Sequence, residues 1–192
     1  SLDIDLKYFL ARRAVILNKI DVFEVMLELE PALLLHISHE YTINETLLAL
    51  AIEFSLLHFV SYILDIVPEL ATTNMNGLES AVDLAIKYEK IGVLGELESK
   101  FGISYKVILL HEGVSLNALQ YSFKTRKCKV FAFYVTKMTK ECALKNLLYI
   151  FGSPMEIFMH ALSATQNNDF YLARILVNVL DFKPISVNDK IT

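Results

Sequence analysis

The chain has 192 residues, of which 54% are hydrophobic and 21% are charged, and its six glycines and four prolines are few for this length. This composition excludes a disordered, collagen-like or low-complexity chain and favours a mostly helical protein. The formal net charge of −4 hides a polarity along the chain. Residues 21–98 hold fourteen acidic and two basic residues, whereas residues 101–192 hold eleven basic and six acidic residues.

Compartment and processing follow from the cysteines and the first residues. Two cysteines, Cys128 and Cys142, are too few for a disulfide framework, so we expect a reducing, cytoplasmic compartment. The first residues have neither a basic nor an apolar region, so no signal peptide is expected there, and the missing initiator methionine suggests a piece of a longer protein. Residues 46–64 approach the length of a membrane span, but interrupting polar residues favour a buried helix pair.

An internal repeat organises the chain. Five segments begin at Ala14, Ala51, Ala85, Ser122 and Ala164, with spacings of 37, 34, 37 and 42 residues. We count from each start as position zero. Positions six, eight, nine and twelve are then apolar or semi-apolar in all five copies, as one face of a helix requires. These twenty residues are Ile20, Val22, Phe23, Met26, Leu57, Phe59, Val60, Ile63, Ile91, Val93, Leu94, Leu97, Cys128, Val130, Phe131, Tyr134, Phe170, Leu172, Ala173 and Leu176.

Position four is polar in every copy, which suits a tight turn between two short helices. Its residues are Asn18, Ser55, Glu89, Arg126 and Asn168. Each unit is therefore predicted to form a helix, a turn, a second helix and a longer connection. Two short helices do not bury their apolar faces alone, so neighbouring units are expected to stack around a continuous core.

One known family shares these features. Thr46, Leu48 and Ala51 match the ankyrin-repeat helix start Thr-Pro-Leu-His-x-Ala. Residues 74–77 (Asn-Met-Asn-Gly) resemble the turn before that motif, and Ser80, Val82 and Ala85 repeat it weakly. The chain thus resembles a divergent ankyrin-repeat protein over about residues 8–182. The resemblance implies an all-α fold, an α-solenoid of about five degenerate ankyrin-like helix-turn-helix repeats.

The resemblance also sets the expected domain organisation. We expect one repeat domain over residues 1–192, with repeats starting near residues 8, 45, 79, 116 and 158. The motif's proline, its histidine and the turn glycine are missing from every copy, which leaves a generic α-solenoid as the alternative. Connections such as residues 31–35 (Pro-Ala-Leu-Leu-Leu) are expected to form either extra helical turns or β-hairpin fingers.

Residues that could carry catalysis or bind a metal are scarce. His36 and His39 have helical ligand spacing, but a zinc site needs three or four ligands, and solvated loop histidines are the alternative. His58 lies beside core positions and is assigned to packing. Cys128 falls on a core position, and Cys142 on a partly exposed helix. We therefore predict no catalytic residues, no metal and no cofactor.

The sharpest local charge is a basic run formed by Lys124, Arg126, Lys127 and Lys129. It continues to Lys145 and alternates with aromatic residues, of which Phe131 and Tyr134 fall on core positions. Three interpretations stay open for the run: a solvated helix face, a patch for a protein partner, or a site for nucleic acid or anionic lipid.

The ankyrin resemblance implies a concave binding face built from positions two and three. In the middle repeats these positions pair a charged with an aromatic residue, as interface hot spots often do. Ile16 and Leu17 hold them in the first copy, where residues 6–10 are expected to bury them. The predicted partner-binding residues are Glu53, Phe54, Met75, Lys87, Tyr88, Lys124 and Thr125.

We therefore predict a protein–protein interaction module without catalysis of its own. The alternatives are the substrate-docking part of an effector enzyme whose catalytic domain lies elsewhere, or an electrostatic binder of nucleic acid or anionic lipid through residues 124–145. The arrays of secreted bacterial effectors and viral host-range proteins look similar, which implies the host cytosol. The partner is expected to be a protein, and the chain a monomer or a weak head-to-tail oligomer.

Overall fold

A computed structural model describes the chain except for residues 1–2, 38–45, 75–77, 164–169 and 182–192. The described part contains eleven α-helices, two short 3-10 helices and one two-stranded sheet, which confirms a mostly helical protein. Contacts divide the chain into two compact units, residues 1–103 and residues 104–192, each described below by itself. None of the described helices is long and apolar enough to cross a membrane.

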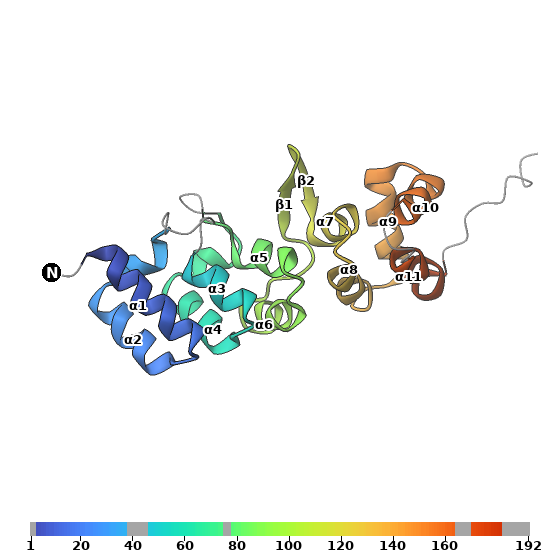
Figure 1. The fold of residues 1–192 in the computed structure, drawn as a ribbon. Helices are drawn as coiled ribbons and strands as arrows, with labels where there is room; N and C mark the ends of the chain where they lie inside the picture. Colours follow the sequence, from blue (N-terminus) through green and yellow to red (C-terminus); the bar gives the residue numbers. More distant parts are fainter. Residues whose placement is uncertain (1–2, 38–45, 75–77, 164–169, 182–192) are drawn as a thin grey trace, which may run out of the picture. The chain divides into compact units, whose positions relative to one another are not determined.

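The first unit consists of three helix pairs that follow one another (Figure 1). The pairs are α1 (Ile4–Ile16) with α2 (Ile20–Leu29), α3 (Leu47–Glu53) with α4 (Leu57–Ile66), and α5 (Ala81–Lys87) with α6 (Ile91–Phe101). Residues 46–64 thus form a helix pair, as expected. The 3-10 helices Pro31–Leu35 and Pro68–Ala71 follow α2 and α4. Each begins with a proline, which suits a first helical position, so these connections form extra helical turns.

One backbone turn recurs within the helix pairs. At position four, Asn18, Ser55, Glu89 and Arg126 have positive φ angles of 55°, 57°, 51° and 61°. The amide of the next residue donates to the carbonyl of position zero, as from Leu56 to Ala51 at 2.9 Å. This is the Schellman closure, in which glycine normally occupies the left-handed position. The turn is thus confirmed in four copies, and Asn168 lies outside the described residues.

The starts of the first helices are also shared. Thr46, Ser80 and Asn117 lie nine residues before the turn residue, and each side chain accepts a hydrogen bond from the backbone amide three residues on. Such caps satisfy amides that the helix itself leaves unpaired. Thr46 and Ser80, which carry the ankyrin resemblance, are therefore the N-caps of α3 and α5.

The predicted core is correct at some repeat positions and wrong at others. Position nine is buried in all five copies, and position eight is buried in all but the first. Position six is wrong as a core position, because Ile20, Leu57, Ile91 and Cys128 open their helices beside the turn and remain partly or largely exposed. Phe170 is exposed as well.

The second unit starts with a β-hairpin, which the sequence analysis did not place. Strand β1 (Ile108–His111) pairs antiparallel with β2 (Val114–Asn117), and Leu109 lies opposite Leu116. Glu112 and Gly113 make the two-residue turn with φ angles of 50° and 79°, as a type I′ hairpin requires. Buried Leu109 and Leu116 face inward, so Ile108, Leu110 and Ser115 lie on the outer face.

Five helices complete the second unit: α7 (Ala118–Lys124), α8 (Cys128–Val135), α9 (Lys140–Phe151), α10 (Pro154–Leu162) and α11 (Tyr171–Leu180). The pair α7–α8 follows the repeat register, with Phe131 and Tyr134 buried as expected. The fifth copy does not follow it in full, because α10 ends at Leu162, before the predicted start at Ala164. Helix α9 packs against α7 and α10.

Candidate binding groove

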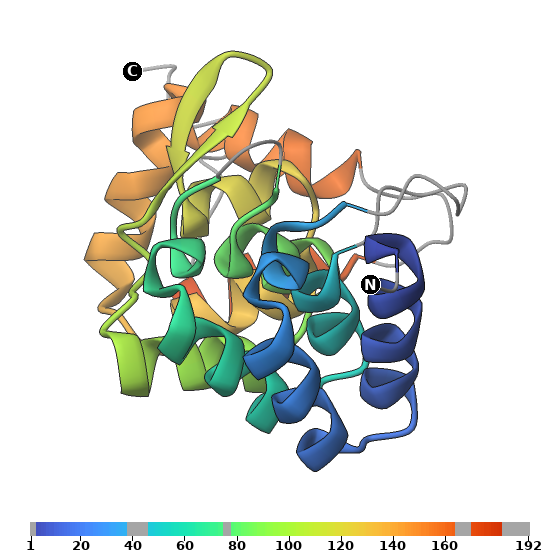
Figure 2. The same ribbon diagram turned by 90° about the vertical axis from the view of Figure 1, so that its left-hand side faces the viewer.

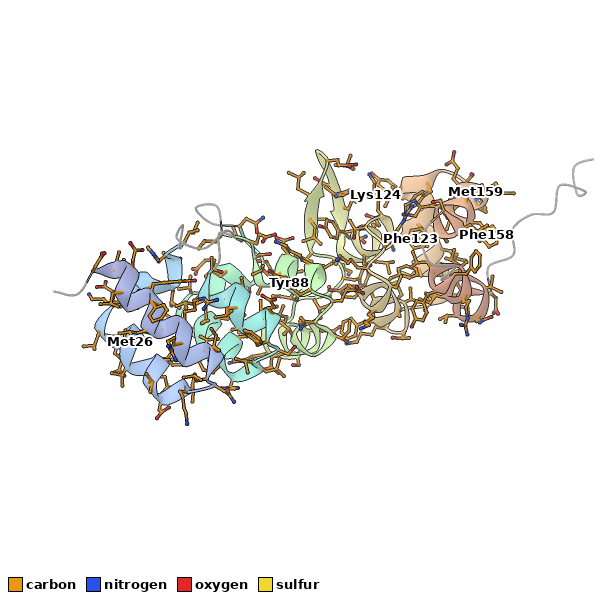
Figure 3. All side chains as sticks on the ribbon, viewed as in Figure 1. Met26, Tyr88, Phe123, Lys124, Phe158 and Met159 are labelled. Atoms are coloured by element: carbon orange, nitrogen blue, oxygen red, sulfur yellow. The ribbon has the colours of Figure 1, made fainter. Side chains whose placement is uncertain are left out.

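The predicted concave residues lie at the ends of first helices. Glu53 and Lys87 end α3 and α5, and Phe54 and Tyr88 are the capping residues that follow. Figure 3 labels Tyr88 at the end of α5. Phe54 is 53% exposed, as a contact residue should be, whereas Lys87 Nζ lies 2.7 Å from Glu79 Oε2. Met75 lies outside the described residues.

The first copy differs from the expectation. Ile16 and Leu17 are both exposed, so residues 6–10 do not bury them. The reason is geometric, because Leu6 and Leu10 point outward from the same helix and are themselves exposed. These four apolar residues therefore belong to the surface of α1.

The basic run does not form one uniform surface. Lys124 Nζ lies 3.8 Å from Glu112 Oε2, and Thr125 Oγ1 donates to the carbonyl of Tyr121 at 2.7 Å. Arg126 donates from Nη2 to Ser163 Oγ at 3.0 Å. Lys127 precedes α8 and is half-buried, whereas Lys129 lies in the first turn of α8 and is exposed. Lys124 and Arg126 are therefore already engaged within the second unit, by Glu112 and Ser163.

The histidines and cysteines fill structural places. His36 is not a solvated loop residue, since its Nε2 lies 3.0 Å from Asp5 Oδ1 and its ring packs on Tyr8. His39 lies outside the described residues. His58 is exposed, with its ring centroid 4.7 Å from that of Phe59. Cys128 is half-exposed at the start of α8, so its assignment to the core was wrong. In the part of the chain that the structure describes, no three His, Cys, Asp or Glu residues could hold a metal.

His160 on α10 is the one of these side chains with a distinct environment. Its ring packs against those of Phe123 and Phe151, with centroids 5.3 and 5.0 Å away, and its Nε2 lies 3.3 Å from the carbonyl oxygen of Phe123. Burial lowers the pKa of His160, and this effect and the charges of Arg126 and Lys124 outweigh the hydrogen bonds to the backbone at Phe123 and Lys124, which raise it. Figure 3 labels Phe123 and Lys124, neighbours on α7.

A groove in the second unit was not predicted from the sequence. It lies between the outer face of the hairpin and α9 and has a volume of about 690 Å³. This volume is within the usual range for ligand sites. Its lining comes from β1, β2, α7 and α9: Ile108, Ser115, Asn117, Gln120, Lys145, Asn146, Leu148 and Tyr149.

Three carboxamides form the floor of this groove. Asn117 and Gln120 cap α7 reciprocally, through contacts of 2.9 and 3.0 Å. Asn117 Nδ2 donates to Asn146 Oδ1 at 2.7 Å, and Gln120 Nε2 donates to the carbonyl of Asn146 at 2.9 Å. The floor therefore ties the hairpin end and α7 to α9.

The polar network continues along α9 to Tyr105. Asn146 Nδ2 donates to the carbonyl of Cys142 at 2.8 Å. Tyr105 Oη lies 3.5 Å from Cys142 Sγ, and this hydrogen bond, together with burial, raises the pKa of Tyr105. Cys142 is thus a half-buried helix residue, as predicted, and its thiol is engaged by a neighbour. The satisfied polar network makes the floor a fixed platform.

The rim of the groove is apolar with one cation. Tyr149 is 85% and Ile108 is 62% exposed, and Leu148 is partly exposed beside them. Lys145 is exposed on α9, no acidic residue lines the groove, and no side chain in the described ranges pairs with its ammonium. An exposed tyrosine, two aliphatic side chains and an unpaired cation suit a ligand with apolar groups and a carboxylate.

Two local signals could have located this groove. The alternation of residues 108–117 around Glu-Gly indicates a hairpin, and Asn-x-x-Gln at 117–120 indicates a capped helix start. Nothing in the sequence places Asn146 beside Asn117. Comparisons with family models, curated proteins and solved structures return no match for this chain.

Proposed function

We propose that the chain is a protein-binding module that holds an extended, acidic segment of a partner protein in the groove between the hairpin and α9. In this proposal the chain catalyses no reaction. Its fold is taken as an array of divergent ankyrin-like repeats. The shared turn in four helix pairs and the caps Thr46, Ser80 and Asn117 support that assignment.

The groove carries the proposal. Its carboxamide floor is already hydrogen-bonded, so a ligand has no need to reorder it. Tyr149 offers a large amphipathic surface, the residue type that dominates interface energetics. Lys145 has no carboxylate to pair with inside the described fold, so an acidic residue of the partner would meet a cation there.

A second contact is retained in the first unit. Glu53 and Phe54, at the end of α3, and Lys87 and Tyr88, at the end of α5, hold equivalent places in packed neighbouring repeats. Exposed Phe54 is its strongest candidate. Substituting Glu53, Phe54 and Tyr88 together should weaken partner binding without unfolding the chain, and unchanged binding would remove this row from the proposal.

The experiment uses a random peptide library displayed on phage as the probe. We expect the chain to select peptides with Asp or Glu next to apolar residues, and Lys145→Glu and Tyr149→Ala to abolish their binding. Lys129→Glu is the matched control, because it makes the same charge change in the basic run and should leave binding intact.

Two results would contradict the groove. Selected peptides that bind Lys145→Glu as well as they bind the native chain would show that the groove is not their site. Loss of binding in Lys129→Glu, together with a steep decline with added salt, would instead favour the electrostatic binder through residues 124–145.

A further inference from the structure

The outer face of the first helix pair lies in front in the view of Figure 2, where α1 and α2 are dark blue and blue. In the two later helix pairs of the first unit, the corresponding face packs against the preceding pair. Three positions of the second helix, eight, eleven and fifteen, form the face that meets the preceding repeat.

Contacts between neighbouring repeats establish this assignment. The ring of Phe59, at position eight of the second repeat, lies 5.0 Å from the ring of Phe23 in the first. Tyr62, at position eleven, lies 6.2 Å from the same ring. Ser61 of the second repeat donates to Oε1 of Glu96, which holds position eleven in the third repeat, over 3.1 Å.

Position fifteen lies at the edge of this face, and Ile66, which holds it in the second repeat, is 44% exposed. Lys100, in the third repeat, lies 2.8 Å from Asp65 of the second. In both later repeats, therefore, one side of the second helix is the stacking side.

In the first repeat the same three positions are Val22, Val25 and Leu29, and they are 47%, 54% and 74% exposed. The neighbouring helix repeats the pattern. Leu10 is exposed, whereas its counterparts Leu47 and Ala81 are fully buried. Leu6 extends the apolar stripe along α1. Terminal repeats that end an array carry a polar outer face, and this one carries an apolar stacking face.

The charges of the two helices indicate what covers it. Exposed Arg13 lies near the end of α1, and exposed Asp21 lies at the start of α2. The other charges are engaged within the chain, since Lys7 Nζ lies 2.6 Å from Glu30 Oε2, and burial and the carboxylates of Glu24 and Glu28 raise the pKa of Tyr62 on α4. A second copy of the face offers both the apolar stripe and the complementary charges, provided that α1 lies on α2. An isologous two-fold contact meets this condition, since each residue pair then occurs twice.

We propose that two copies of the chain pair through α1 and α2 about a two-fold axis that runs parallel to these helices. That axis places α1 of one copy on α2 of the other with the connecting turns at the same end. Arg13, near the end of α1, then comes close to Asp21 of the second copy, at the start of α2. The apolar stripes of Leu6, Leu10, Val22, Val25 and Leu29 are covered in both copies.

The test is the oligomeric state of the whole chain, measured by sedimentation velocity from about 1 to 100 μM. We expect a dimer that Leu10→Glu with Val22→Glu converts to a monomer, while circular dichroism shows unchanged helix content. Leu110→Glu is the matched control, because it adds a charge at an exposed leucine of the other unit and should leave the dimer intact. A monomer at every concentration overturns the proposal and assigns the face to another occupant, such as a further helix pair.

A charge exchange tests the axis. Arg13→Asp should weaken the dimer about tenfold or more by facing Asp21 of the second copy, and Arg13→Asp with Asp21→Arg should restore it. A dimer that survives Leu10→Glu with Val22→Glu overturns the interface. A doubly exchanged chain that stays as weak as Arg13→Asp overturns the two-fold arrangement.

Discussion

Ser55 occupies a backbone conformation that its side chain disfavours, so replacing it with glycine should stabilise the protein. Its φ of 57° places it in the left-handed region, where the Cβ atom crowds the carbonyl oxygen. The side chain is exposed, and the turn is held by backbone hydrogen bonds from Ser55 to Ile52 and from Leu56 to Ala51. Ser55→Gly therefore removes the steric cost and leaves the turn bonds in place.

The magnitude follows from two opposing terms. A left-handed residue other than glycine costs about 1–2 kcal/mol. Glycine in turn lowers the free energy of unfolding by about 0.4–1 kcal/mol, because an unfolded chain with glycine has more conformational freedom to lose on folding. The difference predicts that Ser55→Gly raises the free energy of unfolding by roughly 0.5–1 kcal/mol.

Urea unfolding followed by circular dichroism measures this change. Glu53→Gly is the matched control, since Glu53 lies in the last turn of α3 with helical geometry and glycine there should destabilise by about 0.5–1 kcal/mol. Ser55→Ala keeps the left-handed penalty and should not stabilise. A Ser55→Gly chain no more stable than the native one would refute the argument that strain is stored in this turn.

Substitutions at three further positions test the caps, the core and the half-buried His160. Ser80→Ala should cost about 1 kcal/mol in urea unfolding, since the Asp83 amide loses its acceptor, whereas Ser80→Thr keeps the hydroxyl and should keep most of the stability. Phe59→Ala should cost about 3–5 kcal/mol, because a fully buried ring between two repeats is removed; a loss below about 1 kcal/mol would contradict the stacking assignment. His160 has a lowered pKa, so below its usual value of 6.5 the unfolded chain binds more protons, and stability falls as the pH decreases through the folded pKa. His160→Phe should flatten this part of the pH profile, and an equal slope in both chains would show that other groups cause it.

Local chemistry made the helix pairs predictable. A polar residue at position four and a serine or threonine nine residues earlier are signals that depend on a few neighbouring residues. The structure places Ser55 in the turn and Thr46 at the cap accordingly. Core positions eight and nine were predictable for the same reason, because they depend on one helix face.

The groove depends on residues that are far apart in the chain. Asn117 and Asn146 are 29 residues apart and meet only through the packing of α7 against α9. The hairpin also lies outside the repeat pattern, since residues 108–117 have no counterpart in the other copies. The predicted burial of two residues was also wrong. Val22 and Cys128 are apolar enough for a core, but Val22 lies on an outer face and Cys128 at the start of a helix.

The recurring turn gives the first unit a set of equivalent attachment points. Asn18, Ser55 and Glu89 occupy the same place in three successive repeats, and the backbone rather than the side chain closes each turn. Spectroscopic labels at these positions would therefore sit in matched surroundings, one per repeat. The distances between them would report directly how far neighbouring repeats bend or slide when a partner binds.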